Sequence, residues 1–299
     1  MKPLAKQIVT FLCLVFFFSS LPYFLLIHAH HIGAGNGLAV RMIMWCPAAA
    51  AFATCTIFRI DTRTLGWSWR PVRFEVLGYL LPLAYAIPVY IVTWIAVPGS
   101  FALKAFEDKA AASLSLSSSP HLATFGLMIP MLATLGVIGS VANALGEEIG
   151  WRGFLLPRLT SQFGFTFGCL VSGLVWAIWH YPGLLWSDYN AGTNPAYALT
   201  CFTLMVTADA FIMGWLRLKS GSLWPCALLH ASHNLFIQAI LDEMTAPAGR
   251  ALYYTTEFGC GLVLTVAATA TYLWTKRADL PHPSRLEPES SPAIAQSAM

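Results

Sequence analysis

The stretch Gly146-Glu147-Glu148-Ile149-Gly150-Trp151-Arg152-Gly153 follows an apolar run at residues 121–145 and places three charges beside a hydrophobic segment. Charge is scarce in this chain, because 10% of its 299 residues are Asp, Glu, Lys or Arg. A soluble globular protein carries about 25% charged residues. Ionisable groups near bilayer depth are costly, so they tend to be paired and functional. The stretch therefore predicts a polar site inside a helical membrane protein.

The rest of the composition agrees with this class. Hydrophobic residues make up 57% of the chain and aromatic residues 13%, and the mean hydropathy is +0.63. Apolar runs repeatedly approach the ~20 residues that a helix needs to span the hydrocarbon core. We therefore expect an all-α fold, a polytopic integral membrane bundle of about eight transmembrane helices. The expected spans are residues 7–27, 40–58, 74–97, 121–145, 166–186, 197–216, 223–241 and 252–275.

The distribution of basic residues predicts that the N-terminus and the C-terminus are both cytoplasmic. With eight spans and a cytoplasmic N-terminus, 13 of the 17 Lys and Arg residues fall on the cytoplasmic side. This is the bias of the positive-inside rule. The first span is interpreted as a retained anchor, because its apolar part exceeds the 7–15 residues of a signal peptide. The expected location is the cell membrane, if the host is bacterial.

Composition also divides the chain into segments. Residues 1–119 should hold N-terminal transmembrane helices and a solvated far-side loop at 98–120, and residues 120–242 hold the polar motifs. Residues 243–277 should form a C-terminal transmembrane helix. The tail at 278–299 is rich in Pro, Ser, Glu and Ala, so we expect it to be disordered.

Two negative expectations follow from the charge and the cysteines. The net charge of +3 is small, so no nucleic-acid partner is expected. The seven cysteines form no CxxC pair and nearly all lie in apolar runs, which favours free thiols over disulfides or a metal site.

Helical spacing separates the roles of the charges in the first motif. Glu148 and Arg152 are four residues apart and can pair on one helix face, whereas Glu147 points about 100° away. Arg152 would hold Glu148 ionised and oriented, and Glu147 would accept a proton from water as a general base. The alternative is an ordinary surface ion pair at a helix end. The three glycines of the stretch favour close packing over that alternative.

Two further segments place polar side chains inside apolar runs. His180 follows Trp176 by four residues, so Trp176 should stack beneath the imidazole. His230 and Asn234 are also four apart and together could donate hydrogen bonds to a tetrahedral oxyanion. His233 falls on another face, so we expect a packing or supporting role for it. Each signal alone is weak, and the hypothesis requires that the three segments converge.

Together these motifs resemble the three signature motifs of the CAAX-protease and bacteriocin-processing family, also called Abi, CPBP or type II CAAX prenyl endopeptidases. The resemblance covers about residues 120–242, which it identifies as a catalytic core. One departure is visible, because the second motif usually begins with Phe and here begins with Trp176.

The resemblance implies an intramembrane glutamic endopeptidase that acts within the lipid bilayer on a membrane-associated peptide or protein, with or without a prenyl group. Positions matching Glu147 and His180 would activate water, and those matching His230 and Asn234 would form the oxyanion site. The positions matching Glu148 and Arg152 would support them.

Other functions remain open from the residues. Glu, His and His could ligate zinc, but the chain lacks HExxH and its two motif histidines lie on different spans, so we expect no cofactor and no metal. A non-catalytic immunity or scaffold protein would not need two adjacent glutamates. A secondary transporter should show symmetric broken spans, which the sequence lacks.

The expected depths of the candidate site residues in the membrane disagree with one another. Counted from the loop near Phe165, His180 lies ~22 Å into its span at 1.5 Å per residue. Glu147 and His230 are expected nearer the cytoplasmic side. Either the segment after Arg152 returns into the membrane, or the assumed start of span five is wrong.

Overall fold

The computed structural model describes residues 3–69 and 71–281, which form an all-helical protein. Within these residues no β-strand occurs, and the sole β-type pairing is an isolated bridge between Phe101 and Thr245. The α-helices are α1 Pro3–Ala29, α2 Ala34–Phe58, α3 Val72–Ala96, α4 Leu103–Ser113, α5 Ile129–Met131, α6 Val137–Glu148, α7 Leu156–Trp186, α8 Pro195–Ser220, α9 Trp224–His233 and α10 Cys260–Thr275. π-Helical segments are η2 Leu122–Met128, η3 Leu132–Gly136, η4 Ile149–Leu155 and η5 Asn234–Leu241, and short 3₁₀ turns are η1 Thr62–Leu65, η6 Ala251–Tyr253 and η7 Arg277–Asp279.

Seven of the eight predicted spans lie on helix to within one residue, whereas the last, 252–275, becomes a continuous helix only at Cys260. The chain is a multi-pass integral membrane protein. Among the described residues, five helical segments are long and apolar enough to cross a membrane. They are Pro3–Ala29, Gly35–Phe58, Val72–Ala96, Leu122–Trp186 and Pro195–Ser220. The helices at 224–241 and 260–275 are shorter, so the number of eight transmembrane helices stays a prediction.

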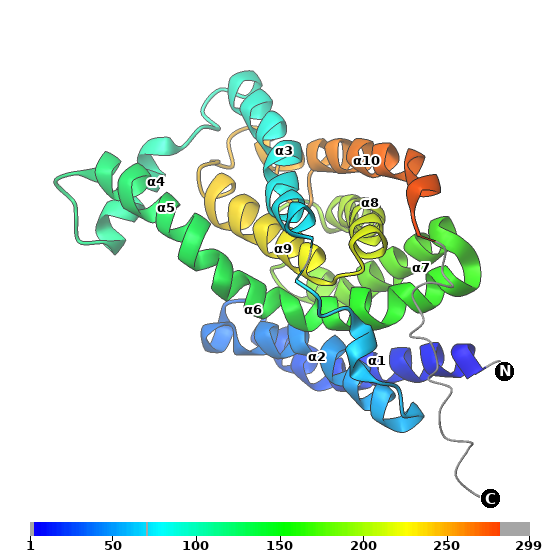
Figure 1. Ribbon diagram of the computed structural model, residues 1–299. Helices are drawn as coiled ribbons and strands as arrows, with labels where there is room; N and C mark the ends of the chain where they lie inside the picture. The colour runs from blue at the N-terminus through cyan, green and yellow to red at the C-terminus, as the bar shows by residue number, and fades with distance from the viewer. Residues whose placement is uncertain (1–2, 70, 282–299) are drawn as a thin grey trace, which may run out of the picture.

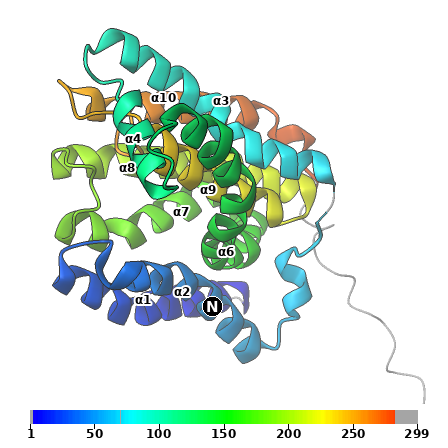
Figure 2. The ribbon, with the colours of Figure 1, turned by 90° about the vertical axis from the view of Figure 1, so that its left-hand side faces the viewer.

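The helices pack in layers around α6 and α7 (Figures 1 and 2). α1 and α2 pack together on one side, where α2 contacts α6 and α1 contacts α7. On the other side α8 packs on α7, and α9 packs on α6. α3 lies against α9, and α10 covers α8. The unit formed by α6 and α7 is therefore contacted by four helices, α1, α2, α8 and α9.

A reversal of the chain at Gly164 determines which residues of the two central helical segments lie beside each other. α6 continues without a break through η4 into α7, until Gly164 adopts φ 77° and ψ 170°. This φ favours glycine, which lacks the Cβ that would clash there. The chain then turns back, so that Gly168 packs on Thr160.

The reversal corrects the predicted boundary at residue 145 and removes the inconsistency in depth. Glu147 lies 17 residues before Gly164, and His180 lies 16 residues after it. At ~1.5 Å per residue, both lie about 25 Å from the turn. The charged stretch is thus interior to a long helix, and residues 156–163 extend the fourth helix.

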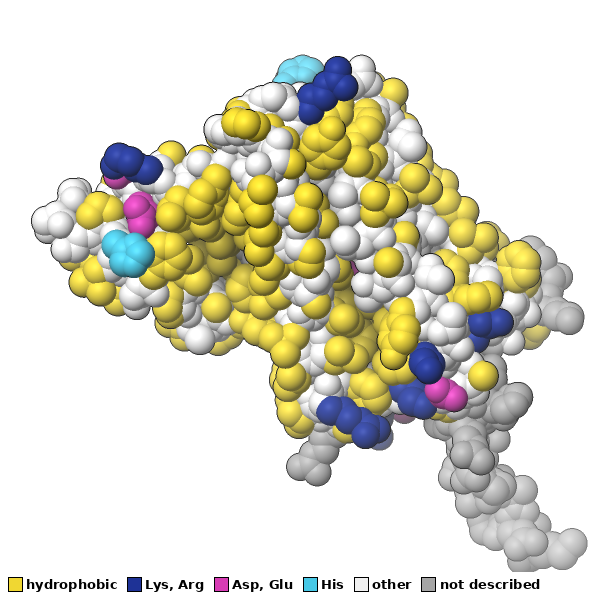
Figure 3. Space-filling view, turned by 90° about the horizontal axis from the view of Figure 1, so that it is seen from above, with side chains coloured by type: hydrophobic (Ala, Val, Ile, Leu, Met, Phe, Trp, Pro, Cys, Tyr) yellow, Lys and Arg dark blue, Asp and Glu magenta, His cyan; other side chains and the backbone are white. Residues whose placement is uncertain are grey.

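The start and the end of the described chain lie at one end of the molecule (Figure 1). Arg158 Nε donates to Gln7 Oε1 at 3.1 Å, and Lys219 Nζ donates to the carbonyl oxygen of Asp279 at 2.5 Å. Charged side chains gather at opposite ends in Figure 3, and hydrophobic side chains cover much of the surface between them. That the termini face the cytoplasm remains a prediction.

Two outer segments differ from expectation in detail. The expected loop at 98–120 contains α4, which buries Phe106, Ala110 and Ala111. Most of the predicted disordered tail, residues 282–299, lies outside the described residues. The seven cysteines are free thiols, as predicted, although Cys13 is exposed.

Candidate active site

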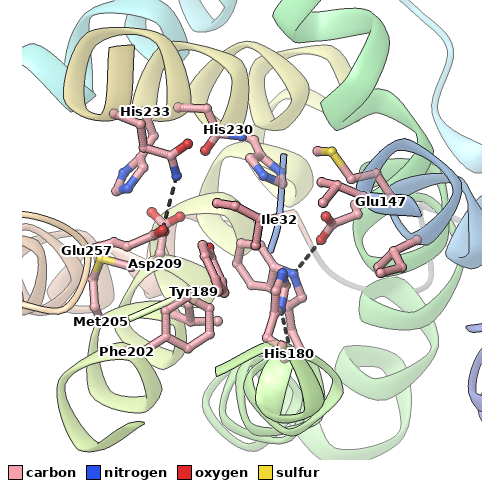
Figure 4. Close-up of a pocket in the computed structure, with 18 of the residues that line it drawn as sticks. Ile32, Glu147, His180, Tyr189, Phe202, Met205, Asp209, His230, His233 and Glu257 are labelled. Carbon is pink, nitrogen blue, oxygen red and sulfur yellow. Dashed lines mark hydrogen bonds between the residues drawn. The ribbon is translucent and has the colours of Figure 1, made fainter. Parts of the chain in front are cut away.

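A buried pocket brings together side chains from three of the predicted motifs (Figure 4). Glu147 at the end of α6, His180 on α7, His230 on α9 and Asn234 at the start of η5 all line it. The pocket offers about 210 Å³ to water-sized molecules, which is room for several waters at about 10–15 Å³ each. The spatial convergence that the sequence required is therefore present.

Glu148 and Arg152 lie behind this pocket as a buried ion pair. Arg152 Nη1 donates to Glu148 Oε1 at 3.0 Å, and the two side chains are 1% and 0% exposed. His230 Nδ1 lies 2.9 Å from the same oxygen and donates to it. The alternative of a solvated surface pair is therefore wrong. Glu148 instead fixes the ring of His230, which leaves Nε2 for the pocket.

Glu147 is held by two indoles. Trp176 Nε1 donates to Glu147 Oε2 at 2.6 Å, and Trp151 Nε1 donates to the same oxygen at 3.3 Å. The Glu147 residue is 2% exposed. Burial of a carboxylate is costly unless hydrogen bonds compensate it, and these two indoles supply that compensation. The second carboxylate oxygen remains available to a ligand in the pocket.

Trp176 does not stack beneath His180 as expected. The two rings meet edge to face with centroids 6.1 Å apart, and the guanidinium of Arg152 lies 3.9 Å from the centroid of the indole. Trp176 thus contacts residues of the first and third motifs as well, since its ring lies 5.6 Å from that of His230.

The tautomer of His180 follows from its partner. His180 Nδ1 lies 3.0 Å from the carbonyl oxygen of Trp176, which can only accept a hydrogen bond. Nδ1 therefore carries a proton, and Nε2 of the neutral ring has a free lone pair. Figure 4 shows His180 and Glu147 on the same side of the pocket.

The glycines of the first motif allow α6 and η4 to lie directly on α2. A Cβ on Gly146 would lie 2.5 Å from the carbonyl oxygen of Met44, and one on Gly150 would lie 2.4 Å from Pro47 Cβ. Real Cβ atoms do not approach so closely. The backbone approach places Glu147 beside Met44, which also lines the pocket.

Sequence reasoning missed several polar residues of the pocket. His233 was assigned to packing or support, yet it lines the pocket, with Nδ1 2.8 Å from the hydroxyl of Tyr85. Asp209, Glu257 and Gln238 also line it. Asp209 and Glu257 each stand alone in an apolar run, and that isolation was the available signal.

A contact between two loops lies beside the pocket, at Ile32. His31 Nδ1 lies 2.5 Å from Asp188 Oδ2, and the backbone N–H of Ile32 donates to Asp188 Oδ1 at 2.8 Å. Ile32 itself lines the pocket. Burial acts to raise the pKa of Asp188, but the hydrogen bonds from His31 and Ile32 outweigh it and hold the pKa below its usual value.

Within residues 3–69 and 71–281, no three His, Cys, Asp or Glu side chains are grouped so that they could hold a metal ion. Glu147, His180 and His230 therefore do not form such a group in this arrangement.

Comparison with known proteins confirms the resemblance inferred from the motifs. Residues 129–236 match the family model described as type II CAAX prenyl endopeptidase Rce1-like, and all six motif residues fall within this match. The chain is also similar to CAAX prenyl protease 2 of Methanococcus maripaludis, with 26% identity over 77 residues. That similarity covers 25% of this chain and 28% of the relative, so the chain spans less than a third of the curated relative that it matches.

Proposed function

We propose that this membrane protein, which resembles type II CAAX prenyl endopeptidases, is an intramembrane endopeptidase. Its substrate would be a membrane-associated peptide or protein, with or without a prenyl group. The observation that carries the proposal is the meeting of Glu147, His180, His230 and Asn234 around one pocket that can hold water.

The first chemical step follows from the positions of these groups. Glu147 accepts a proton from a water molecule, whose oxygen attacks the carbonyl carbon of the peptide bond. His180 Nε2 accepts a hydrogen bond from the same water and orients it. Glu147 then delivers the proton to the leaving nitrogen as the C–N bond breaks. The products are a carboxylic acid and an amine, which exchange a proton to become a carboxylate and an ammonium group.

The negative charge that develops on the carbonyl oxygen must be stabilised by hydrogen-bond donors. Asn234 offers its amide N–H, and His230 offers Nε2 when the ring carries both protons. Preorganised donors of this kind contribute about 10²–10³ in kcat. Glu148 and Arg152 act as positioning residues, because they hold His230 and Trp176 rather than face the pocket.

The remaining walls are suited to a substrate that arrives from a membrane. Apolar side chains of α1 and α2 line the pocket, so an extended apolar segment can lie beside the polar groups. These side chains are Leu26, Val40, Ile43 and Met44.

The test compares the full-length protein with Glu147→Gln, His180→Asn and His230→Gln, each by proteomic analysis of membrane-protein cleavage products in the host. General base removal should lower cleavage by roughly 10²–10⁴-fold. Glu243→Gln is the matched control, since Glu243 pairs with Lys109 on the exposed surface. If all three variants accumulate normally and leave every product unchanged, the protein is not a hydrolase, and a scaffold role is favoured.

A second experiment addresses zinc. The purified protein is stripped by exhaustive chelation, its metal content is measured, and cleavage is assayed again. Activity that survives chelation supports a water activated by glutamate alone. Activity that returns only on addition of zinc would overturn the metal-free mechanism.

A further inference from the structure

The pocket has an acidic wall that the proposed reaction does not use. Asp209 comes from α8, and Glu257 comes from the segment that precedes α10. Figure 4 shows both on the side of the pocket away from Glu147, next to Tyr189. A second group of acidic side chains therefore faces the same cavity.

These two carboxyls lack a basic partner. In the part of the chain that the structure describes, no ion pair involves Asp209 or Glu257. Asp209 is 6% exposed, and its Oδ1 has no hydrogen-bond partner. Glu257 is equally buried and accepts a hydrogen bond from Gln238 Nε2 at 3.1 Å. Buried acids in a membrane protein are costly, which marks them as functional.

The surroundings of the acids fit a cation with an apolar stem. Tyr189 and Phe202 line the same wall, with their rings edge to face and their centroids 6.0 Å apart. Aromatic faces attract ammonium and guanidinium groups, and an alkyl chain packs well on such rings. Met205 adds a flexible apolar contact. Carboxylates and aromatic rings together form a binding wall for a positively charged side chain.

We propose that Asp209 and Glu257 form a specificity subsite that takes a lysine or arginine side chain of the substrate peptide, near the scissile bond. This inference rests on the proposed function, because it takes the bound molecule to be the substrate. The positive group would satisfy the oxygens of both acids, while Tyr189 and Phe202 would cover its stem. The remaining carboxylate, Glu147, stays free for water because it lies on the other side of the pocket.

The test measures binding and therefore does not depend on turnover. The full-length protein and its Glu147→Gln variant are placed in lipid nanodiscs and titrated with short apolar peptides, capped at both ends. Each peptide contains one central lysine, arginine, norleucine or glutamate. A charged hydrogen bond contributes about 1.5–3 kcal/mol, so the lysine and arginine peptides should bind roughly 10–100-fold more tightly than the norleucine peptide.

Substitutions then assign the preference to the acidic wall. Asp209→Asn and Glu257→Gln, each nearly equal in shape to the original residue, should reduce the ratio of lysine to norleucine affinity toward one. Asp108→Asn is the control, because Asp108 is an exposed acid paired with Lys104 on α4, and it should keep the full ratio. Thermal unfolding of each variant checks that it is folded.

The outcomes separate the two proposals. Equal binding of lysine and norleucine peptides by the wild-type protein overturns the subsite, whatever the cleavage result. A preference that survives in both variants overturns it as well. If the cationic preference is present and depends on the two acids, but Glu147→Gln leaves cleavage unchanged in cells, the wall binds cations and the endopeptidase proposal fails alone.

Discussion

The indole N–H of Trp176 donates a 2.6 Å hydrogen bond to Glu147, although 29 residues separate them in the chain. This contact joins the first two motifs directly. A phenylalanine, the usual residue of the family at this position, has no group that could donate it. The same ring lies under the guanidinium of Arg152, which pairs with Glu148, so Trp176 contacts two charged residues of the first motif.

Replacement of Trp176 by Phe should lower kcat and leave KM nearly unchanged. The ring would still separate Arg152 from the pocket, but Glu147 would lose its shortest hydrogen bond and its fixed orientation. A loss of roughly tenfold in kcat is expected, since a hydrogen bond to a charged group contributes about 1.5–3 kcal/mol. Steady-state kinetics on a cleaved peptide checks this. A variant with wild-type kcat would show that Trp151 alone suffices to hold Glu147.

Removal of one partner of the buried pair should destabilise the protein. In Glu148→Gln, Arg152 would remain buried and without its charge partner, which costs about 3–5 kcal/mol. The double variant Glu148→Leu/Arg152→Met should recover much of this stability, because apolar residues fill the site without any charge. It should nevertheless remain inactive, since His230 would lose the acceptor for Nδ1. Thermal unfolding in detergent and peptide cleavage measure the two effects separately, and an active double variant would contradict the positioning role.

Asn234→Leu should reduce kcat far more than it raises KM. The substitution removes an amide donor from the pocket, and loss of one oxyanion donor costs about 10²–10³ in kcat. Asn234→Asp tests the sign of the interaction, because a carboxylate in place of the amide would repel a developing negative charge. A normal kcat in either variant would remove Asn234 from the oxyanion site.

Gly146→Ala should impair folding, whereas Gly139→Ala should not. The added methyl group at 146 would meet the backbone of Met44 and Trp45, and overpacking of this kind costs about 1–3 kcal/mol or more. At Gly139 no atom lies within 4 Å of the added carbon. Alanine there should raise helix stability by up to about 1 kcal/mol. Both glycines lie on α6, so the difference in melting temperature isolates the contact with α2.

The loop that carries Ile32 should loosen in acid. The pKa of Asp188 is held below its ordinary value of 3.8, so the contact is intact above that value and is lost as the pH falls through the lowered pKa. Asp188→Asn should reproduce the loosening at neutral pH. Hydrogen exchange of residues 28–36 would report it, with exchange roughly several-fold faster in the variant. Protection that is identical in the variant would show that Asp188 does not hold Ile32.

The sequence predicted the helices well, because each apolar run is long enough to require intramolecular hydrogen bonds within a bilayer. It failed at the end of the fourth span. Three charges within six residues resemble the exit of a helix from the membrane, yet Glu148 and Arg152 neutralise each other and Glu147 is bound by indoles. Neighbouring charges therefore concealed that the helix continues to Gly164.

Local spacing at i and i+4 predicted the ion pair of Glu148 and Arg152, and it placed His230 and Asn234 on one helix face, where both line the pocket. It could not predict Asp209 or Glu257, because neither has a polar partner at helical spacing. They reach one wall only through the packing of α8 against the segment before α10. Contacts of that kind depend on tertiary structure, which a single sequence does not encode in any short pattern.

The turn at Gly164 fixes the alignment of the helical segment before it with the helical segment after it. Inserting or deleting one residue in a single segment would slide its polar side chain by ~1.5 Å and rotate it by about 100°. Trp176 would then point away from Glu147, although every residue of the three motifs would be unchanged. Functional chains built on this hairpin must therefore keep the count of residues between Glu147 and His180 as strictly as the identity of either one.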